Sequence, residues 1–253
     1  DRLRSRGLGD VYKRQDDTTP EGEQVNIYGN HVGSWNFAAT AYLNRWKVKI
    51  YYEHYFDDHS QMFFQYGRWK DGHIGLEITF PKNRFIDTFV YEGLGTKDQT
   101  GPMLYDSFWG KFEEQISAKD NYYNHYLYQG WQHWGMGIGN PLLPGPIYNK
   151  NGQITFISNR VLAHHIGFCG SPCQSLSYRM LLSYSRHWGT YDNPLNEIKK
   201  QFNSLFEVTY APQQLKGWSF TVSGAMDRGN LLGNNYGGML VIRKQGIIKS
   251  GNK

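Results

Sequence analysis

Long apolar runs, charged residues and cysteine are all scarce in this 253-residue chain. No stretch reaches 18 consecutive apolar residues, which excludes a transmembrane helix within these residues. Heptad repeats, collagen triplets and a polar disordered composition are absent too. The chain has only two cysteines, which are too few for a structural zinc site.

Aromatic residues and glycine are abundant instead. Phe, Trp and Tyr make up 16% of the chain, and there are 29 glycines. Charged residues make up 19%, yet the mean hydropathy is −0.64. A chain that is rich in aromatics and glycine but hydrophilic on average favours an all-β protein, either soluble or a membrane barrel.

The first fifteen residues have the character of a translated sequencing adapter. Residues 10–15, Asp-Val-Tyr-Lys-Arg-Gln, are encoded by the end of a transposon adapter used in sequencing libraries. We therefore set residues 1–15 aside from the fold, with a genuine basic N-terminal arm as the alternative. The segment holds five basic and two acidic residues, so the net charge of +5 falls to +2 without it. This charge predicts no nucleic-acid partner.

The remaining sequence alternates in the manner of β-hairpins. In residues 33–44 one face carries Trp35, Phe37 and Leu43, and residues 46–56 alternate again. Period two with one apolar face predicts strands. Residues 16–32 read as an irregular lead-in, and residues 193–200 allow one or two helical turns. Further strands are predicted at 61–69, 73–80, 84–94, 160–168, 176–187, 201–211, 217–227 and 236–244.

Strand length and loop length point to a membrane barrel more than to a soluble sandwich or propeller. Several predicted strands have the 9–11 residues or so that a tilted barrel strand needs to cross a bilayer, and many end in Tyr or Trp. The predicted connections alternate between short (169–175, 212–216) and long (188–199, 228–235). Short periplasmic turns opposite longer outer loops are typical of outer-membrane barrels, and they place the C-terminus on the periplasmic side.

Residues 121–148 are the densest part of the chain in aromatic residues, histidine and glycine. Aromatic faces stack on sugar rings, and imidazoles and amides bond to sugar hydroxyls. This segment can therefore bind sugar, or it can be a strand that continues into a loop filling the barrel lumen. The two interpretations are compatible.

Other reactive residues predict little chemistry. The histidines show no metal-ligand spacing, so no metal is predicted. Cys169 and Cys173 flank Gly170-Ser171-Pro172, a spacing that allows a small disulfide across a turn in an exported protein. The carboxylates, among them Glu113 and Asp192, invite a glycosidase hypothesis, but spacing alone does not pair two of them.

Several blocks of the chain resemble the Wzi-type capsule assembly outer-membrane proteins. The blocks are residues 120–131 (Asp-Asn-Tyr-Tyr-Asn-His-Tyr-Leu-Tyr-Gln-Gly-Trp), 137–142, 159–161, 163–167, 184–191 and 232–237. The resemblance extends over most of residues 30–247. It implies a monomeric outer-membrane barrel that binds capsular polysaccharide and helps to assemble or anchor the capsule, without catalysis or a cofactor.

We expect the polysaccharide to contact aromatic and polar residues of the dense segment and of the 184–191 block. These residues are Tyr126, Trp131, His133, Trp134, Arg186, Trp188 and Tyr191. Trp35, Phe37 and Leu43 should face the lipid of the outer membrane. A porin or transporter barrel is the main alternative, with Arg160, Arg179, Arg186 and Arg228 as lumen charges, and a glycan hydrolase is a weaker one.

The resemblance also predicts an incomplete barrel. The family has 18 strands, whereas about ten are visible in residues 33–247, followed by a tail at 248–253. The chain is therefore expected to be the C-terminal portion of a longer protein. Its residues should form a curved, unclosed sheet or a distorted small barrel, because an open edge cannot stay unpaired in lipid.

Overall fold

The computed structural model describes residues 33–56, 71–83, 85–98, 121–124 and 131–246. Strands account for most of these residues, and the part of the chain that is described contains no α-helix. The elements are β1 (Gly33–Leu43), β2 (Trp46–Phe56), β3 (Gly72–Thr79), β4 (Thr88–Gly95), β5 (Gln132–His133), β6 (Met136–Gly137), η4 (Pro146–Tyr148), β7 (Val161–Cys173), β8 (Leu176–Gly189), β9 (Pro194–Tyr210), β10 (Trp218–Gly229) and β11 (Asn235–Lys244).

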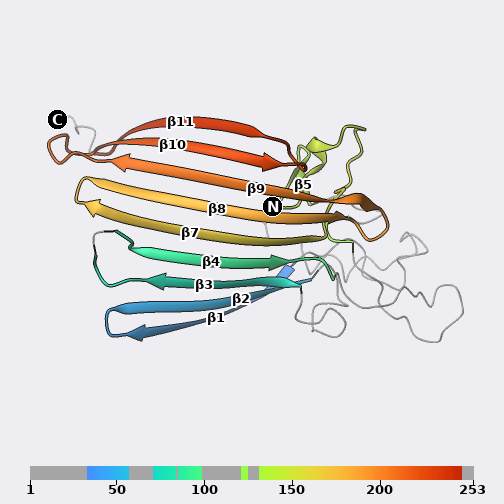
Figure 1. The fold of residues 1–253 in the computed structure, drawn as a ribbon, viewed down its shortest axis with the longest axis horizontal. Helices are drawn as coiled ribbons and strands as arrows, with labels where there is room; N and C mark the ends of the chain where they lie inside the picture. The colour runs from blue at the N-terminus through green and yellow to red at the C-terminus, as the bar shows by residue number, and fades with distance from the viewer. Residues whose placement is uncertain (1–32, 57–70, 84, 99–120, 125–130, 247–253) are drawn as a thin grey trace, which may run out of the picture.

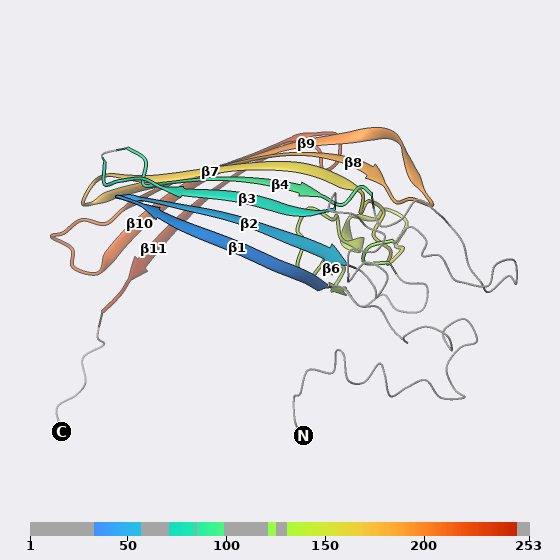
Figure 2. The ribbon, with the colours of Figure 1, turned by 90° about the horizontal axis from the view of Figure 1, so that it is seen from below.

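Nine strands form one antiparallel sheet in the order β1-β2-β3-β4-β7-β8-β9-β10-β11 (Figure 1). The sheet arches, so that β1 and β2 bend to the same side as β10 and β11 (Figure 2). Within the described residues β1 and β11 are the two edges, and they do not pair with each other. The all-β antiparallel architecture and the curved, unclosed sheet are therefore confirmed for this part of the chain.

Local alternation explains the strands that were predicted best. The predicted strands at 33–44 and 46–56 correspond to β1 and β2, which pair from Gly33 opposite Phe56 to Leu43 opposite Trp46. Asn44 in the turn between them has a φ of 56°. Asparagine tolerates this left-handed conformation better than most residues, so it suits a tight turn between two strands.

The structure corrects several predicted boundaries. β7 runs through Ser171-Pro172 to Cys173, and the turn lies at 174–175 instead. The register shifts between Gly170 and Cys173, and such a bulge accommodates a proline inside a strand. The predicted helical turns at 193–200 are wrong, because β9 begins at Pro194. The predicted strand at 61–69 lies outside the described residues.

The connections between consecutive strands lie at two opposite ends of the sheet. One end, here called the turn end, carries the connections 44–45, 80–87, 174–175 and 211–217. The other, the loop end, carries 57–71, 96–160, 190–193 and 230–234. The long loops predicted at 188–199 and 228–235 are wrong, because β8 and β9 leave only residues 190–193 between them, and β10 and β11 leave only residues 230–234.

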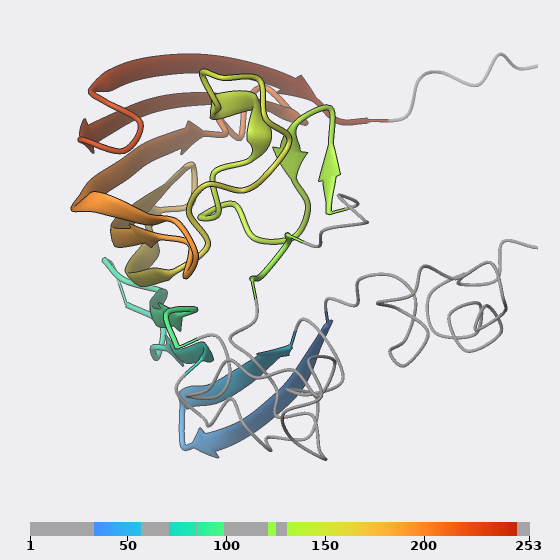
Figure 3. The ribbon, with the colours of Figure 1, turned by 90° about the vertical axis from the view of Figure 1, so that its right-hand side faces the viewer.

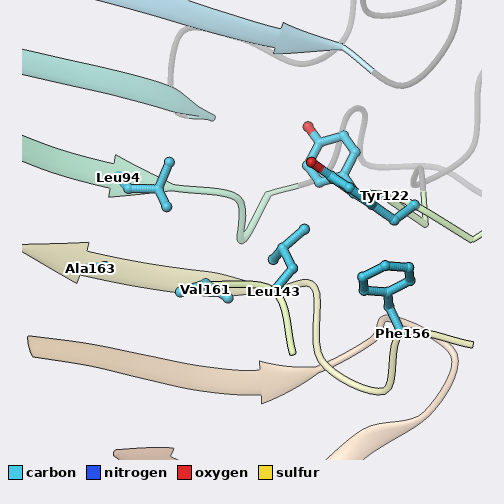
Figure 4. Close-up of a cluster of buried hydrophobic side chains, with 7 residues drawn as sticks. Leu94, Tyr122, Leu143, Phe156, Val161 and Ala163 are labelled. Carbon is cyan, nitrogen blue, oxygen red and sulfur yellow. The ribbon is translucent and has the colours of Figure 1, made fainter. Parts of the chain in front are cut away.

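The main hydrophobic core lies between the sheet and residues 121–124 and 131–160, here called the inner segment. The inner segment sits inside the curve of the sheet at the loop end (Figure 3). Seven buried side chains form the core (Figure 4): Leu94, Tyr122, Tyr123, Leu143, Phe156, Val161 and Ala163. The core therefore joins the inner segment to the concave side of β4 and β7, and it leaves the convex side uncovered.

Candidate functional site

The two faces of the sheet have opposite chemistry. We call the convex face the outer face and the concave face, which meets the inner segment, the inner face. Phe37, Ile50 and Leu240 on the outer face are 53%, 54% and 64% exposed. Large apolar side chains of a water-soluble sheet normally turn inward, so this arrangement is inverted.

Register shows how continuous the outer apolar surface is. Two consecutive rows of directly opposed residues cross all nine strands without a charged side chain. They are Ala41, Val48, Ile78, Phe89, Phe168, Met180, Phe206, Gly224 and Gly238, and then Ala39, Ile50, Leu76, Tyr91, Ile166, Leu182, Ser204, Met226 and Tyr236. Aromatic side chains flank these rows toward both ends, with Trp46 and Trp218 at the turn end and Trp35 and Trp188 at the loop end.

The inner face carries ionisable and amide side chains that contact each other. His73 lies between two carboxylates, with Nδ1 3.7 Å from Glu53 Oε2 and Nε2 3.6 Å from Glu92 Oε1. Tyr51 donates a hydrogen bond to the same Glu92 oxygen. His165 Nδ1 lies 2.7 Å from Ser183 Oγ. Polar groups on this face are therefore partnered across neighbouring strands.

Polar side chains further along the inner face, on β8 to β10, also have partners on neighbouring strands. Asn203 Nδ2 donates to Asp227 Oδ1 at 2.7 Å. Arg179 approaches Glu207 Oε1 at 3.3 Å, and Ser223 Oγ donates to Glu207 Oε2 at 3.1 Å. Each of these contacts joins adjacent strands. The partnered polar side chains of the inner face, here called the polar row, therefore extend from β2 to β10.

A cavity of about 780 Å³ lies between the inner face and the inner segment. Its walls include Glu53, His73 and Glu92 from the sheet, and Tyr123 and Tyr148 from the inner segment. The described residues that line it supply carboxylates, imidazoles, amides and phenols, and none of them is lysine or arginine. Such a mixture can bond to hydroxyl groups while presenting aromatic surface.

Buried polar contacts anchor the inner segment to the loop end of the sheet. Asn159 is fully buried, and its Nδ2 donates to Asn121 Oδ1 at 2.6 Å and to the Tyr122 carbonyl at 2.7 Å. Tyr122 OH donates to Asp71 Oδ2 at 2.9 Å, and Thr96 Oγ1 donates to the Asn159 carbonyl at 2.7 Å. The sequence motif 159–161 therefore belongs to an anchoring network, which alternation alone does not reveal.

The expected polysaccharide contacts within the inner segment differ in exposure. Tyr126 lies outside the described residues. Trp131 is half-buried and packs against the core. His133 and Trp134 lie at the β5–β6 hairpin, with ring centroids 6.2 Å apart, and Trp134 is 83% exposed. Trp134 is thus the aromatic face of this segment most open to a ligand.

The other three expected contacts gather at the loop end of the outer face. The Arg186 guanidinium lies 5.0 Å from the Trp188 ring centroid, and Lys97 Nζ lies 4.9 Å from the same centroid. The Arg160 guanidinium lies 4.9 Å from the ring centroid of Tyr191. Lys97 and Arg160 were not among the expected contacts, because only the pairing of distant strands brings them to this place.

The lumen charges expected for a porin are mostly misplaced. Arg179 lies on the inner face and pairs with Glu207. Arg186 is opposite Leu162, and Arg228 is opposite Phe202, which places both on the outer face. Arg160 precedes Leu162 by two residues and shares its side of the strand. Three of the four arginines therefore do not face the concave side.

The cysteines do not form the disulfide that their spacing allowed. Cys169 and Cys173 are both free thiols on β7. Four residues along an extended strand span about 13 Å, whereas bridged Cα atoms are about 4.4–6.8 Å apart. The predicted turn between them is strand, and this is why the prediction is wrong.

The described residues contain no group of three or more His, Cys, Asp or Glu side chains that could hold a metal ion. They also contain no helix with the length and apolarity that a membrane crossing requires.

No family model, curated protein or solved structure matches this chain. The functional argument therefore depends on the two faces of the sheet and on the aromatic and basic residues of its loop end.

Proposed function

We propose that the sheet forms part of the wall of an outer-membrane β-barrel. This barrel binds surface polysaccharide at its loop end, without catalysis. One observation carries the membrane assignment, namely the two uncharged rows that cross all nine strands of the outer face. Barrels of this class have an apolar outward band flanked by aromatic residues and a polar interior. The outer face has the apolar band with flanking aromatic residues, and the inner face has the polar character of a barrel interior.

The free-energy cost of placing charged and polar groups in lipid also supports the membrane assignment. A lysine or arginine at the bilayer midplane of such a barrel costs about 2–4 kcal/mol, so selection removes charge from the outward band. The polar row of the inner face would be equally costly in lipid but is stable beside water or beside other polar groups. A soluble sheet would need another layer to cover its outer face, and the described residues provide none.

Polysaccharide binding rests on the loop end. Trp134, at 83% exposure, offers an open ring, and His133 lies beside it. Sugar rings stack on such faces, and nearby imidazole and amide groups bond to their hydroxyls. The resemblance to capsule assembly proteins gives the polymer class, a capsular polysaccharide, and a non-catalytic anchoring role.

The membrane assignment can be tested with two neighbouring positions. Cys169 and Cys173 are first replaced by serine, and then Ile50→Cys and Lys49→Cys variants of the complete gene product are spin-labelled in lipid vesicles. The label at position 50 should collide with lipid-dissolved oxygen, and the label at position 49 with a water-soluble nickel complex. Equal exposure of both labels to the nickel complex would refute the lipid-facing wall.

The polysaccharide assignment needs a separate test in the host. Deleting the gene should leave polymer synthesis intact but shift polymer from the cell surface to the medium, as measured by anti-glycan staining of both fractions. Complementation with the Trp134→Ala variant should restore less cell-bound polymer than complementation with the unchanged gene. Unaltered retention after deletion would reject the anchoring role while leaving the membrane wall untouched.

A further inference from the structure

Five basic residues occur side by side at the loop end of the outer face. This outer basic row consists of Lys97, Arg160, Arg186, Lys200 and Arg228, one each from β4, β7, β8, β9 and β10 or the residues next to them. Arg186 is directly opposite Lys200, and Arg228 is opposite Phe202, two positions further along β9. The row thus crosses five adjacent strands.

Contacts place the row on one side of the sheet. Lys97 and Arg186 both lie over the Trp188 ring, with cation-to-centroid distances of 4.9 and 5.0 Å. Arg160 Nε donates to the Lys97 carbonyl at 3.2 Å. Lys200 and Arg228 are exposed, and their register puts them on the face of Arg186. The five charged side chains therefore lie on the outer face and do not line the cavity on the inner face.

No carboxylate among the described residues lies within ion-pair distance of these five side chains. None of the five forms an ion pair there, whereas Lys47, Arg179 and Lys199 each pair with a glutamate. Glu197 pairs with Lys199, and Asp227 accepts a hydrogen bond from Asn203. The nearest carboxylates along β9 and β10 are thus engaged with other partners.

Two details show that Arg186 and Lys200 lack an acceptor or a counter-charge for their positive charge among the described residues. Like charges directly opposite on neighbouring strands repel, and Arg186 and Lys200 form such a pair. Arg186 Nε is shielded from solvent and has no hydrogen-bond partner among the described residues. An anion that met several of these cations would relieve the repulsion and supply the missing acceptor.

We propose that the outer basic row binds the phosphate groups of an anionic membrane lipid. The inference rests on the proposed membrane wall, because the row adjoins the uncharged rows over which acyl chains would lie. Guanidinium groups match phosphate oxygens in a two-pronged geometry, and the Trp188 ring holds two of the cations in place. Aromatic residues at this level are typical of the membrane–water interface.

The test measures lipid retention by the protein purified in detergent. Native mass spectrometry compares binding of diphosphoryl lipid A with binding of its dephosphorylated form. The Arg186→Gln/Lys200→Gln double variant should bind the phosphorylated form at least fivefold more weakly. Lys199→Gln is the matched control, because it removes the same charge one residue away on the other face and should change affinity less than twofold.

Several outcomes would overturn the proposal. Equal retention of the two lipid forms would exclude phosphate recognition, and so would unchanged affinity in the double variant. Displacement by millimolar inorganic phosphate would indicate a free-anion site rather than a lipid site. Lys200→Gln alone gives a second measurement, since Lys200 is exposed and its loss does not threaten folding. Loss of lipid A binding with intact lipid labelling at position 50 would leave the membrane wall standing.

Discussion

The outer and inner faces belong to the same nine strands, yet they are stabilised in different ways. The inner face has a packed core with the inner segment, where Phe156 is 1% exposed, and a series of partnered polar groups. The described residues form no such packed core on the outer face, where large apolar side chains remain open. The inner face therefore has the inner segment as a packing partner among the described residues, and the outer face has no such partner there.

The sharpest test of the packing on the inner face removes the aromatic ring that the inner segment buries against it, Phe156. Phe156→Ala should destabilise the inner segment by about 3–5 kcal/mol, because a buried phenyl ring leaves a cavity. Urea unfolding in detergent, together with protease sensitivity of residues 131–160, measures this. The control is Phe206→Ala on the outer face, where a 50% exposed ring should matter far less in detergent. Equal losses of stability in the Phe156→Ala and Phe206→Ala variants would contradict the proposed difference between the two faces.

A charge placed on the outer face should have the next largest effect. Ile50→Arg should lower the free energy of unfolding in lipid vesicles by about 2–4 kcal/mol, since the position lies in an uncharged row. Lys49→Arg, one residue away on the inner face, should change stability very little. Urea titration of both variants in vesicles makes the comparison. A tolerated arginine at position 50 would mean that this face does not contact lipid.

Removing a buried hydrogen-bonding side chain that anchors the inner segment should have the third largest effect on stability. Asn159→Ala removes two donated hydrogen bonds and leaves the Tyr122 carbonyl without this donor in a buried place. We expect a loss of about 1–3 kcal/mol, the usual cost of an unsatisfied buried group. Thermal unfolding in detergent is the measurement. Asn203→Ala, which removes a half-buried amide on the inner face, should cost less, and the reverse order would contradict the anchoring role.

The smallest effect is expected for an ion pair near water. Lys47 Nζ lies 3.2 Å from Glu77 Oε1, with side chains 39% and 28% exposed. Glu77→Gln should therefore cost less than about 1 kcal/mol, and high salt should reduce the difference further. Unfolding at low and high salt tests this. A loss that is large and independent of salt would show that the inner face is drier than its exposure indicates.

Alternation along the chain was sufficient to predict most strands. Both faces of β1 and β2 follow from the order of apolar and polar residues between positions 33 and 56. The method failed where the order was uninformative. The start of β9, Pro-Leu-Asn-Glu-Ile-Lys-Lys, is strand because it pairs with the end of β8 near Gly189. Gly189 has a φ of 85°, and a Cβ there would lie 2.6 Å from the Leu195 nitrogen, so the turn needs glycine.

The candidate site was predicted only in part. The composition of residues 121–148 indicated an aromatic segment, and Trp134 is indeed open. The gathering of Lys97, Arg160 and Trp188 was not predictable, because the first and last of these residues are far apart in the chain. Antiparallel pairing of β4 with β7 and of β7 with β8 brings them together.

Alternation of apolar and polar residues along the sequence is enough to give most of these strands two distinct faces. Successive side chains of an extended backbone point to opposite sides, so the order of residues assigns each one to a face. The concave face, the segment that packs inside it and the clustering of cations at the loop end follow from how distant strands pair. Those features depend on register between distant strands and on where the inner segment folds back, and neither is encoded in a local pattern.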